Sequence, residues 1–152
     1  MIMSIIFMST IGLAQKITPD KVPANVKQAL MKEYPKAGEA AWRMDDNNYQ
    51  AMFTMNGNKY AAKFDKNGIW IDKEERIVIT DVPKDIRASI AKNFAGFTVY
   101  EAEKVEANGK GILYNVGLEK EKEFLEVHLS PAGDVLDKVT KTKKTEWGKD
   151  ND

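Results

Sequence analysis

The sequence contains no cysteine and a single histidine, and these absences exclude several kinds of chemistry. Without cysteine there is no disulfide, thiolate nucleophile, cysteine-ligated zinc, iron–sulfur cluster or lipid-modified N-terminal cysteine. One histidine excludes any mechanism that needs two imidazoles. The net charge is also zero, with 23 Lys and Arg against 23 Asp and Glu. The cationic surplus typical of nucleic-acid binding is therefore missing, and we expect no nucleic-acid partner.

The beginning of the chain is apolar. Residues 2–14 contain no charged side chain, and the first charge is at Lys16. The run is too short to span a membrane, which takes about 20 apolar residues. Its length, and the small residues Gly12 and Ala14 near its end, are typical of a secretory signal, so we predict cleavage between Ala14 and Gln15. The alternative is a buried N-terminal strand or helix. Export predicts a periplasmic or secreted protein that is not anchored through cysteine.

The 152 residues suffice for one ordinary domain, and they contain two copies of one unit. Five positions recur sixty residues apart: Val22, Pro23, Val26, Leu30 and Tyr34 match Val82, Pro83, Ile86, Ile90 and Phe94. The spacing of four between apolar positions predicts amphipathic helices near 23–34 and 83–94, each with a proline at its start.

After each helix the sequence alternates between apolar and polar residues and passes through a turn, at 65–68 and at 130–133. This pattern predicts about four antiparallel strands per repeat. Two such sheets joined edge to edge would give an α+β fold with one roughly eight-stranded antiparallel sheet and both helices on one face. A five-residue insertion lengthens the hairpin near 107–111 in the second repeat.

The repeats also define the predicted domain organisation of the chain. It consists of a signal peptide (1–14), an N-terminal linker (15–21), a first repeat (22–80), a second repeat (81–142) and a polar C-terminal tail (143–152).

The ordered pair of repeats resembles the bacterial PepSY-like, β-lactamase-inhibitor-like proteins over about residues 20–140. The likeness lies in Val22-Pro23, Tyr34-Pro35, Tyr49-x-Ala51-x-Phe53 and 64–70 of the first half, and in 81–83, Tyr114-x-Val116 and 132–136 of the second. The resemblance implies helices on one sheet face, a bare opposite face, and binding or inhibition of a protein partner, for example an exported peptidase. Ser130 stands where the pattern has Asp, so no function is attached to that turn.

The only histidine lies in a predicted strand. Alternation within 124–129 sends Leu125 toward the helices and places Glu126 and His128 on the bare face. A histidine–carboxylate pair can orient a general base, but no nucleophile accompanies it, and we predict that the protein is not an enzyme. The alternatives are an ordinary surface histidine and a pH-sensitive partner contact.

Trp70 is the candidate aromatic contact. If Ile71 points to the core, parity places Trp70 on the bare face, together with Lys63 of the preceding strand. A large exposed aromatic flanked by charge is typical of a protein-binding hot spot. The alternative is a tryptophan that covers a sheet edge or the seam between the repeats.

Two oxygen-rich segments, 45–48 and 65–68, could suggest calcium, but neither has the ligand spacing of an EF-hand, and turns require the same residues. No metal site and no cofactor is therefore predicted. The sequence favours an exported, non-enzymatic protein-binding module that uses Trp70, Lys63, Glu126 and His128. The alternative function is an envelope carrier of a small ligand or a metal ion.

Overall fold

The computed structural model describes residues 15–142. The predicted signal peptide (1–14) and polar tail (143–152) lie outside this range. The described strands are β1 (Gln15–Ile17), β2 (Ala41–Asp45), β3 (Asn48–Met55), β4 (Asn58–Phe64), β5 (Trp70–Arg76), β6 (Thr98–Ala107), β7 (Gly111–Lys120), β8 (Glu123–Leu129) and β9 (Val135–Lys141). The α-helices are α1 (Ala24–Glu33) and α2 (Lys84–Asn93), and short 3-10 helices η1 (Pro19–Lys21) and η2 (Ile79–Asp81) precede them.

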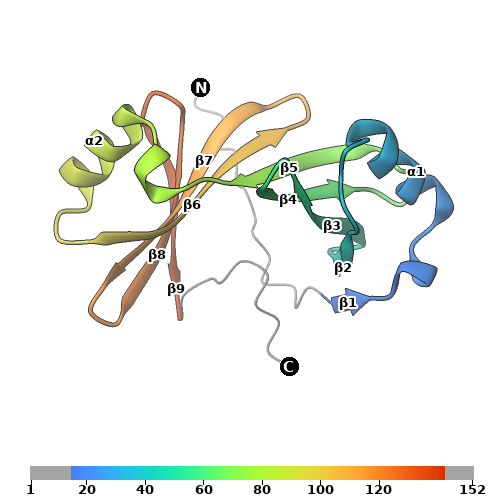
Figure 1. Cartoon of the computed structure of the whole chain (residues 1–152). Helices are drawn as coiled ribbons and strands as arrows, with labels where there is room; N and C mark the ends of the chain where they lie inside the picture. Colours follow the sequence, from blue (N-terminus) through green and yellow to red (C-terminus); the bar gives the residue numbers. More distant parts are fainter. Residues whose placement is uncertain (1–14, 143–152) are drawn as a thin grey trace, which may run out of the picture.

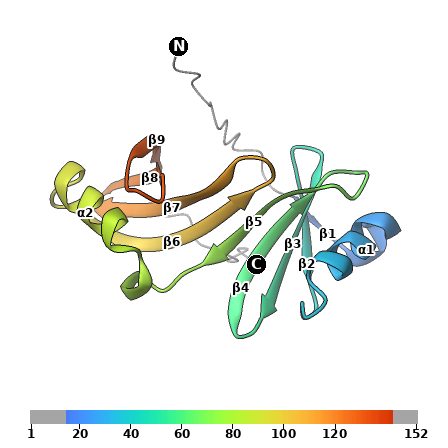
Figure 2. The same ribbon diagram turned by 90° about the horizontal axis from the view of Figure 1, so that it is seen from above.

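The nine strands form one antiparallel sheet in sequence order, and α1 and α2 lie toward opposite ends of it (Figure 1). Seen from above, the sheet twists strongly between its two halves (Figure 2). The predicted α+β fold, with two helices and one open antiparallel sheet, is confirmed. Each repeat contributes one helix and four strands, β2–β5 and β6–β9.

The ninth strand, β1, was not predicted from the sequence. The segment 15–21, interpreted there as a linker, contains β1 and η1. β1 pairs with β2 from Gln15 opposite Met44 to Ile17 opposite Trp42. Three residues with little apolar alternation give no strand signal of their own, so this pairing depends on the edge that β2 offers.

The two helices begin and end in the same way. Pro23 and Pro83 stand immediately before the first helical residue, with φ of −56° and −54°, which is the angle that a helix start requires. At the other end the amides of Tyr34 and Phe94 donate to carbonyls one turn back, each at 2.8 Å. The predicted helices at 23–34 and 83–94 are therefore confirmed.

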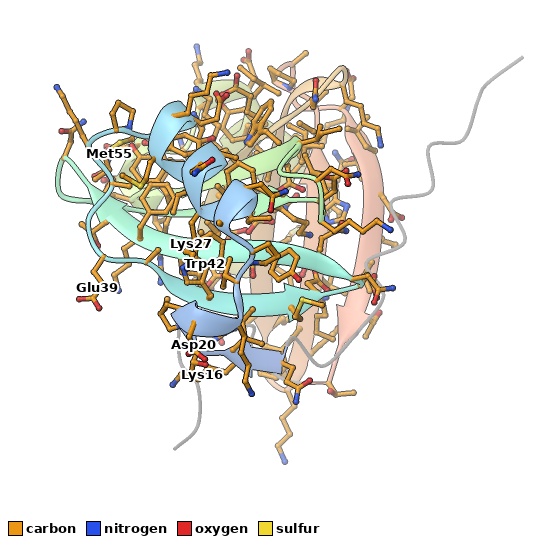
Figure 3. All side chains as sticks on the ribbon, turned by 90° about the vertical axis from the view of Figure 1, so that its right-hand side faces the viewer. Lys16, Asp20, Lys27, Glu39, Trp42 and Met55 are labelled. Carbon is orange, nitrogen blue, oxygen red and sulfur yellow. The ribbon has the colours of Figure 1, made fainter. Side chains whose placement is uncertain are left out.

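Each helix packs on its own half of the sheet, and all these contacts are on one sheet face. Beneath α1 the buried core consists of Val22, Val26, Leu30, Trp42, Ala51, Phe53, Tyr60, Ala62 and Phe64. Beneath α2 it consists of Val82, Ile86, Ile90, Phe94, Ala102, Val116, Leu118, Leu125, Val127 and Leu129. Figure 3 shows α1 lying across β2 and β3, near Trp42.

A glycine turn supports the beginning of each helix. Gly68 and Gly133 have φ of +80° and +89°, which glycine adopts without steric cost. A Cβ on Gly68 would lie 3.0 Å from the carbonyl oxygen of Asn25, and one on Gly133 only 2.6 Å from that of Asp85. The turn therefore needs glycine for its conformation and for its close approach to the helix.

The residue that opens each of these turns holds it through a side-chain oxygen. Asp65 Oδ1 accepts hydrogen bonds from the amides of Asn67 and Ile69, both at 2.8 Å. Ser130 Oγ accepts from the amide of Asp134 at 3.1 Å. The oxygens of the 65–68 segment thus stabilise a turn, and Ser130 performs the same task with a hydroxyl.

The insertion in the second repeat joins the two halves. It lengthens the β6–β7 hairpin so that β6 pairs with β5, from Asp72 opposite Ala107 to Arg76 opposite Glu103. Beyond the paired residues, the Asn108 amide donates to the carbonyl of Ile71 at 2.8 Å. This pairing of β5 with β6 makes the sheet continuous across the two halves.

Candidate functional site

The sheet face opposite the helices is covered by no helix among the described residues, and we call it the helix-free face. Strand register identifies its side chains, which alternate with those of the two cores. Across the middle of the sheet they are Lys63, Asp72, Glu74, Arg76, Glu101, Glu103, Asn115, Glu126, His128 and Lys141. Glu101, Glu103 and His128 are buried, although most of the buried side chains lie on the opposite face.

Trp70 does not lie on the helix-free face, and the prediction of its position is wrong. Lys63 stands opposite Asp72, but the next residue, Phe64, stands opposite Trp70, so a bulge shifts the register by one residue. Such a bulge reverses the alternation of side chains. Trp70 consequently packs, half-buried, against the core beneath α1. Tyr34 packs against the same core, where burial raises its pKa to about 12.

Lys63 lies on the helix-free face, as expected, within a group of opposite charges. Its Nζ lies 2.9 Å from Asp45 Oδ2 and 4.0 Å from Asp72 Oδ2. Burial by itself would lower the pKa of Lys63, but the two carboxylates outweigh it and raise that pKa. The charged groups that surround Lys63 in the first half of the face are therefore paired with one another.

Glu126 and His128 also lie on this face, and the structure brings them together. Glu126 Oε1 is 3.0 Å from His128 Nε2, and Glu126 Oε2 is 2.9 Å from Lys141 Nζ. Burial would raise the pKa of Glu126, but hydrogen bonds from His128 and Lys141 lower it. His128 is only 5% exposed, so it is not an ordinary surface histidine.

Between these two groups lies a strip of carboxyl groups that sequence reasoning missed: Glu74 on β5, and Glu101 and Glu103 on β6. Arg76 Nη2 approaches Glu101 Oε2 at 3.8 Å. Burial, reinforced by Asp72, raises the pKa of Glu74 to about 7. Burial, reinforced by Glu74 and Glu101, holds the pKa of Glu103 well above its ordinary value.

Three hydrogen-bond acceptors in this strip have no donor among residues 15–142. Glu103 is 8% exposed, and neither it nor Glu74 makes a hydrogen bond or an ion pair with the described residues. On the next strand Asn115, directly opposite Glu103, has a buried Oδ1 without a hydrogen bond. We call Glu74, Glu103 and Asn115 the acceptor cluster. Buried acceptors without donors are costly and rare in folded proteins.

An aromatic pair borders this region. Tyr100 and Phe124 make an edge-to-face contact, with ring centroids 6.4 Å apart. The Tyr100 ring covers Gly117, where an added Cβ would lie 2.6 Å from the ring. Because any side chain at 117 would displace this ring, glycine allows an aromatic surface beside the carboxyl groups.

One signal in the sequence could have found the strip. Glu101 and Glu103 occupy alternate positions on either side of buried Ala102, the pattern of a strand with a polar face. Their proximity to Glu74 depends on which strands are neighbours, and local patterns do not reveal that.

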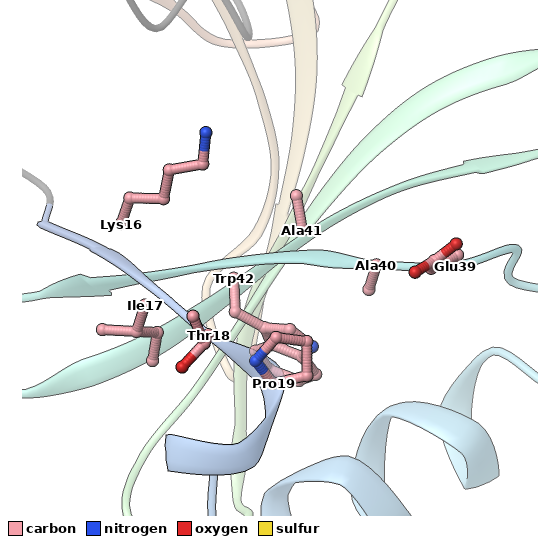
Figure 4. A pocket seen from close by; sticks show the side chains of 8 residues that line it. All are labelled: Lys16, Ile17, Thr18, Pro19, Glu39, Ala40, Ala41 and Trp42. Atoms are coloured by element: carbon pink, nitrogen blue, oxygen red, sulfur yellow. The ribbon is translucent and has the colours of Figure 1, made fainter.

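Two further features bear on ligand binding. No group of three or more His, Asp or Glu side chains within 15–142 is placed to hold a metal ion. A groove of about 600 Å³ lies beside β1 and is lined by Lys16, Ile17, Thr18, Pro19, Glu39, Ala40, Ala41 and Trp42. Figure 4 shows Lys16 and Glu39 toward opposite ends of this groove. Neither of the two ten-residue helices in the described part has the length and apolarity to cross a membrane.

Comparison with known families agrees with this architecture. The family model described as "Putative beta-lactamase-inhibitor-like, PepSY-like" matches residues 47–137, which is more than half of the chain. The chain therefore belongs to the PepSY-like family. No protein with curated functional information matches the sequence.

Similar solved structures come from Bacteroides. A DUF2874 family protein from B. uniformis has a TM-score of 0.76 and 24% identity, over 81% of this chain and 92% of that one. A "putative periplasmic" protein from B. eggerthii has a TM-score of 0.74 and 25% identity, over 78% and 88%. A BLIP-like protein from B. fragilis has a TM-score of 0.71 and 22% identity, over 82% and 92%.

Proposed function

We propose that this protein is an exported, non-enzymatic binding module whose helix-free face docks a protein partner. The observation that carries the proposal is the acceptor cluster on that face. A face that only met water would leave its charged groups hydrated, whereas here Glu103 is buried and lacks a bonded partner. The adjacent aromatic pair of Tyr100 and Phe124 adds the kind of contact that is enriched in protein interfaces.

The family context supports a binding role. The matched family is described as β-lactamase-inhibitor-like, and a similar fold occurs in a protein named BLIP-like. An exported enzyme, such as a peptidase, is a partner of the appropriate kind. The residues do not support catalysis by this chain itself, because the only histidine contacts an ion-paired carboxylate and there is no cysteine.

The apolar segment 2–14 supports export, and so does the periplasmic naming of a similar protein. N-terminal sequencing of the protein from the producing cells tests it. We expect the mature chain to begin at Gln15, and a chain that retains Met1 would contradict export.

Photo-crosslinking tests the docking face. A photoreactive amino acid is placed at Leu113, which stands opposite Val105 on the helix-free face, and separately at Ile112, the next residue of β7 on the other face. We expect a discrete covalent adduct with a second protein from position 113 and none from position 112. Equal adducts from both positions, or none from 113, would contradict the proposal.

A second candidate function is that of an envelope small-ligand carrier. The groove beside β1 favours it, because about 600 Å³ lies within the size range of small-molecule sites. Native mass spectrometry of the protein purified from its own compartment would detect a ligand that co-purifies, and an apo mass would contradict the carrier function.

A further inference from the structure

The acceptor cluster identifies the chemistry of the group that would complete it. Two carboxyl groups and an amide oxygen can accept hydrogen bonds, but none of these atoms can donate one while the carboxyls are ionised. In that ionised state, the group that satisfies all three is rich in donors and carries positive charge. Arg76 stands opposite Glu103 on the neighbouring strand, and its ion pair is with Glu101 at 3.8 Å.

The charges around Glu103 favour an added cation. Glu74 faces it from β5, Glu101 from its own strand and Glu126 from β8, and all three disfavour its ionisation, whereas Arg76 favours it. On β8 and β9, His128 and Lys141 are bonded to Glu126. None of these ion pairs on the helix-free face includes Glu74 or Glu103.

We infer that the acceptor cluster receives an arginine side chain of the protein partner. This inference rests on the proposed docking face and specifies its chemistry. A guanidinium group is planar, carries five N–H donors and pairs with carboxylates in a bidentate manner. It can bond to Glu103 and Glu74 and still offer an N–H to Asn115. The cluster offers two carboxyl groups and one amide oxygen, whereas calcium takes about six to eight oxygen ligands, so an organic cation fits it better than a calcium ion does.

A pair of peptides tests this chemistry on the full chain. The probe is acetyl-Gly-Ser-Arg-Ser-Gly-amide, and the control replaces arginine with citrulline, which has nearly the same shape but no charge. Binding is followed by nuclear magnetic resonance of the carboxyl carbons of Glu74 and Glu103 and the side-chain amide of Asn115. We expect saturable changes at all three groups with the arginine peptide, and a fall in the pH at which Glu103 titrates. We expect neither with the citrulline peptide.

Two variants give the matched comparison. Glu103→Gln should weaken binding of the arginine peptide roughly tenfold or more, because a neutral amide replaces the central charge. Glu106→Gln removes a carboxyl from the same strand but on the opposite face, where it pairs with Lys73, and should leave binding unchanged. Unchanged amide spectra away from the cluster would verify that both variants are folded.

Several outcomes would overturn the inference. These are equal binding of the two peptides, no change at Glu103, or equal loss of binding in both variants. Calcium chloride that reproduces the same changes would assign the site to a metal. Glu103 could also titrate at an ordinary pH in the free chain, and this pH could shift only when Lys143 and Lys144 are replaced by Gln. In that case the chain's own basic segment is the occupant. If position 113 crosslinks to a partner but the peptide test fails, the docking face remains supported. Only the inference that it receives an arginine is then rejected.

Discussion

The two repeats share their packing and differ in the charges that they display. Both place a helix over a glycine turn, through Gly68 beneath Asn25 and Gly133 beneath Asp85. On the helix-free face, Lys63 lies between two carboxylates in the first half. Where the halves meet, the second half adds Glu103, and this carboxyl group makes no ion pair with the residues of 15–142.

Two copies of one unit in a single chain form an internal comparison. Features that both copies keep are those required to fold the unit, namely the proline before the helix, its buried stripe and the glycine turn. Features present in only one copy are not needed to fold the unit. Two of the three members of the acceptor cluster are of this second kind, because Glu103 and Asn115 lie in the lengthened β6–β7 hairpin. The difference between the halves therefore points to function.

The largest effect should come from removing the centre of either core. Phe64→Ala and Leu129→Ala each truncate a fully buried side chain and should lower the free energy of unfolding by about 2–5 kcal/mol. Because one sheet joins the halves, we expect a single transition, in which Leu129→Ala speeds hydrogen exchange in β3 as much as in β8. Exchange that accelerates in β8 alone would mean that the halves unfold separately.

The glycine turns should respond unequally. Gly133→Ala places a Cβ 2.6 Å from a carbonyl oxygen, whereas Gly68→Ala places it at 3.0 Å. Both also impose a positive φ on alanine, so we expect losses of about 2–4 and 1–3 kcal/mol in urea denaturation. Gly109→Ala, with φ of +72° and no atom within 4 Å, isolates the backbone cost and should lose about 1 kcal/mol. A smaller loss at 133 than at 68 would contradict the comparison.

The smallest effect should be on the pH dependence of stability. Folding raises the pKa of Glu74 from 4.5 to about 7 and holds the pKa of Glu103 well above 4.5, so the folded protein binds more protons than the unfolded chain above pH 4.5, up to the two raised pKa values. Their contribution is fully present below that window and is lost as pH rises through it. Between pH 5 and pH 8, Glu103→Gln should therefore lose less stability than wild type, by roughly 1–2 kcal/mol in urea denaturation. Glu106→Gln, the control, should follow wild type, and a profile of Glu103→Gln identical to wild type would contradict this assignment.

Local patterns determined most of the fold. The two helices, the four strands of each repeat and the turns at 65–68 and 130–133 follow from apolar spacing and from proline and glycine positions, all of which act over a few residues. The positions of Lys63, Glu126 and His128 on the helix-free face follow from the same alternation. The sequence alone thus specified the repeated unit and one of its faces.

Tertiary structure decided what depends on register between distant strands. Trp70 lies on the other face because the pairing of β4 with β5 contains a bulge. Alternation along one strand cannot reveal that a residue has no partner on the neighbouring strand. β1 exists because an edge was available to pair with it. Glu74, Glu103 and Asn115 come from three strands, and only the sheet brings their acceptors together. Hydrogen bonding between strands joins residues that are far apart in the sequence, so local patterns do not determine it. The candidate site exists only because of this pairing.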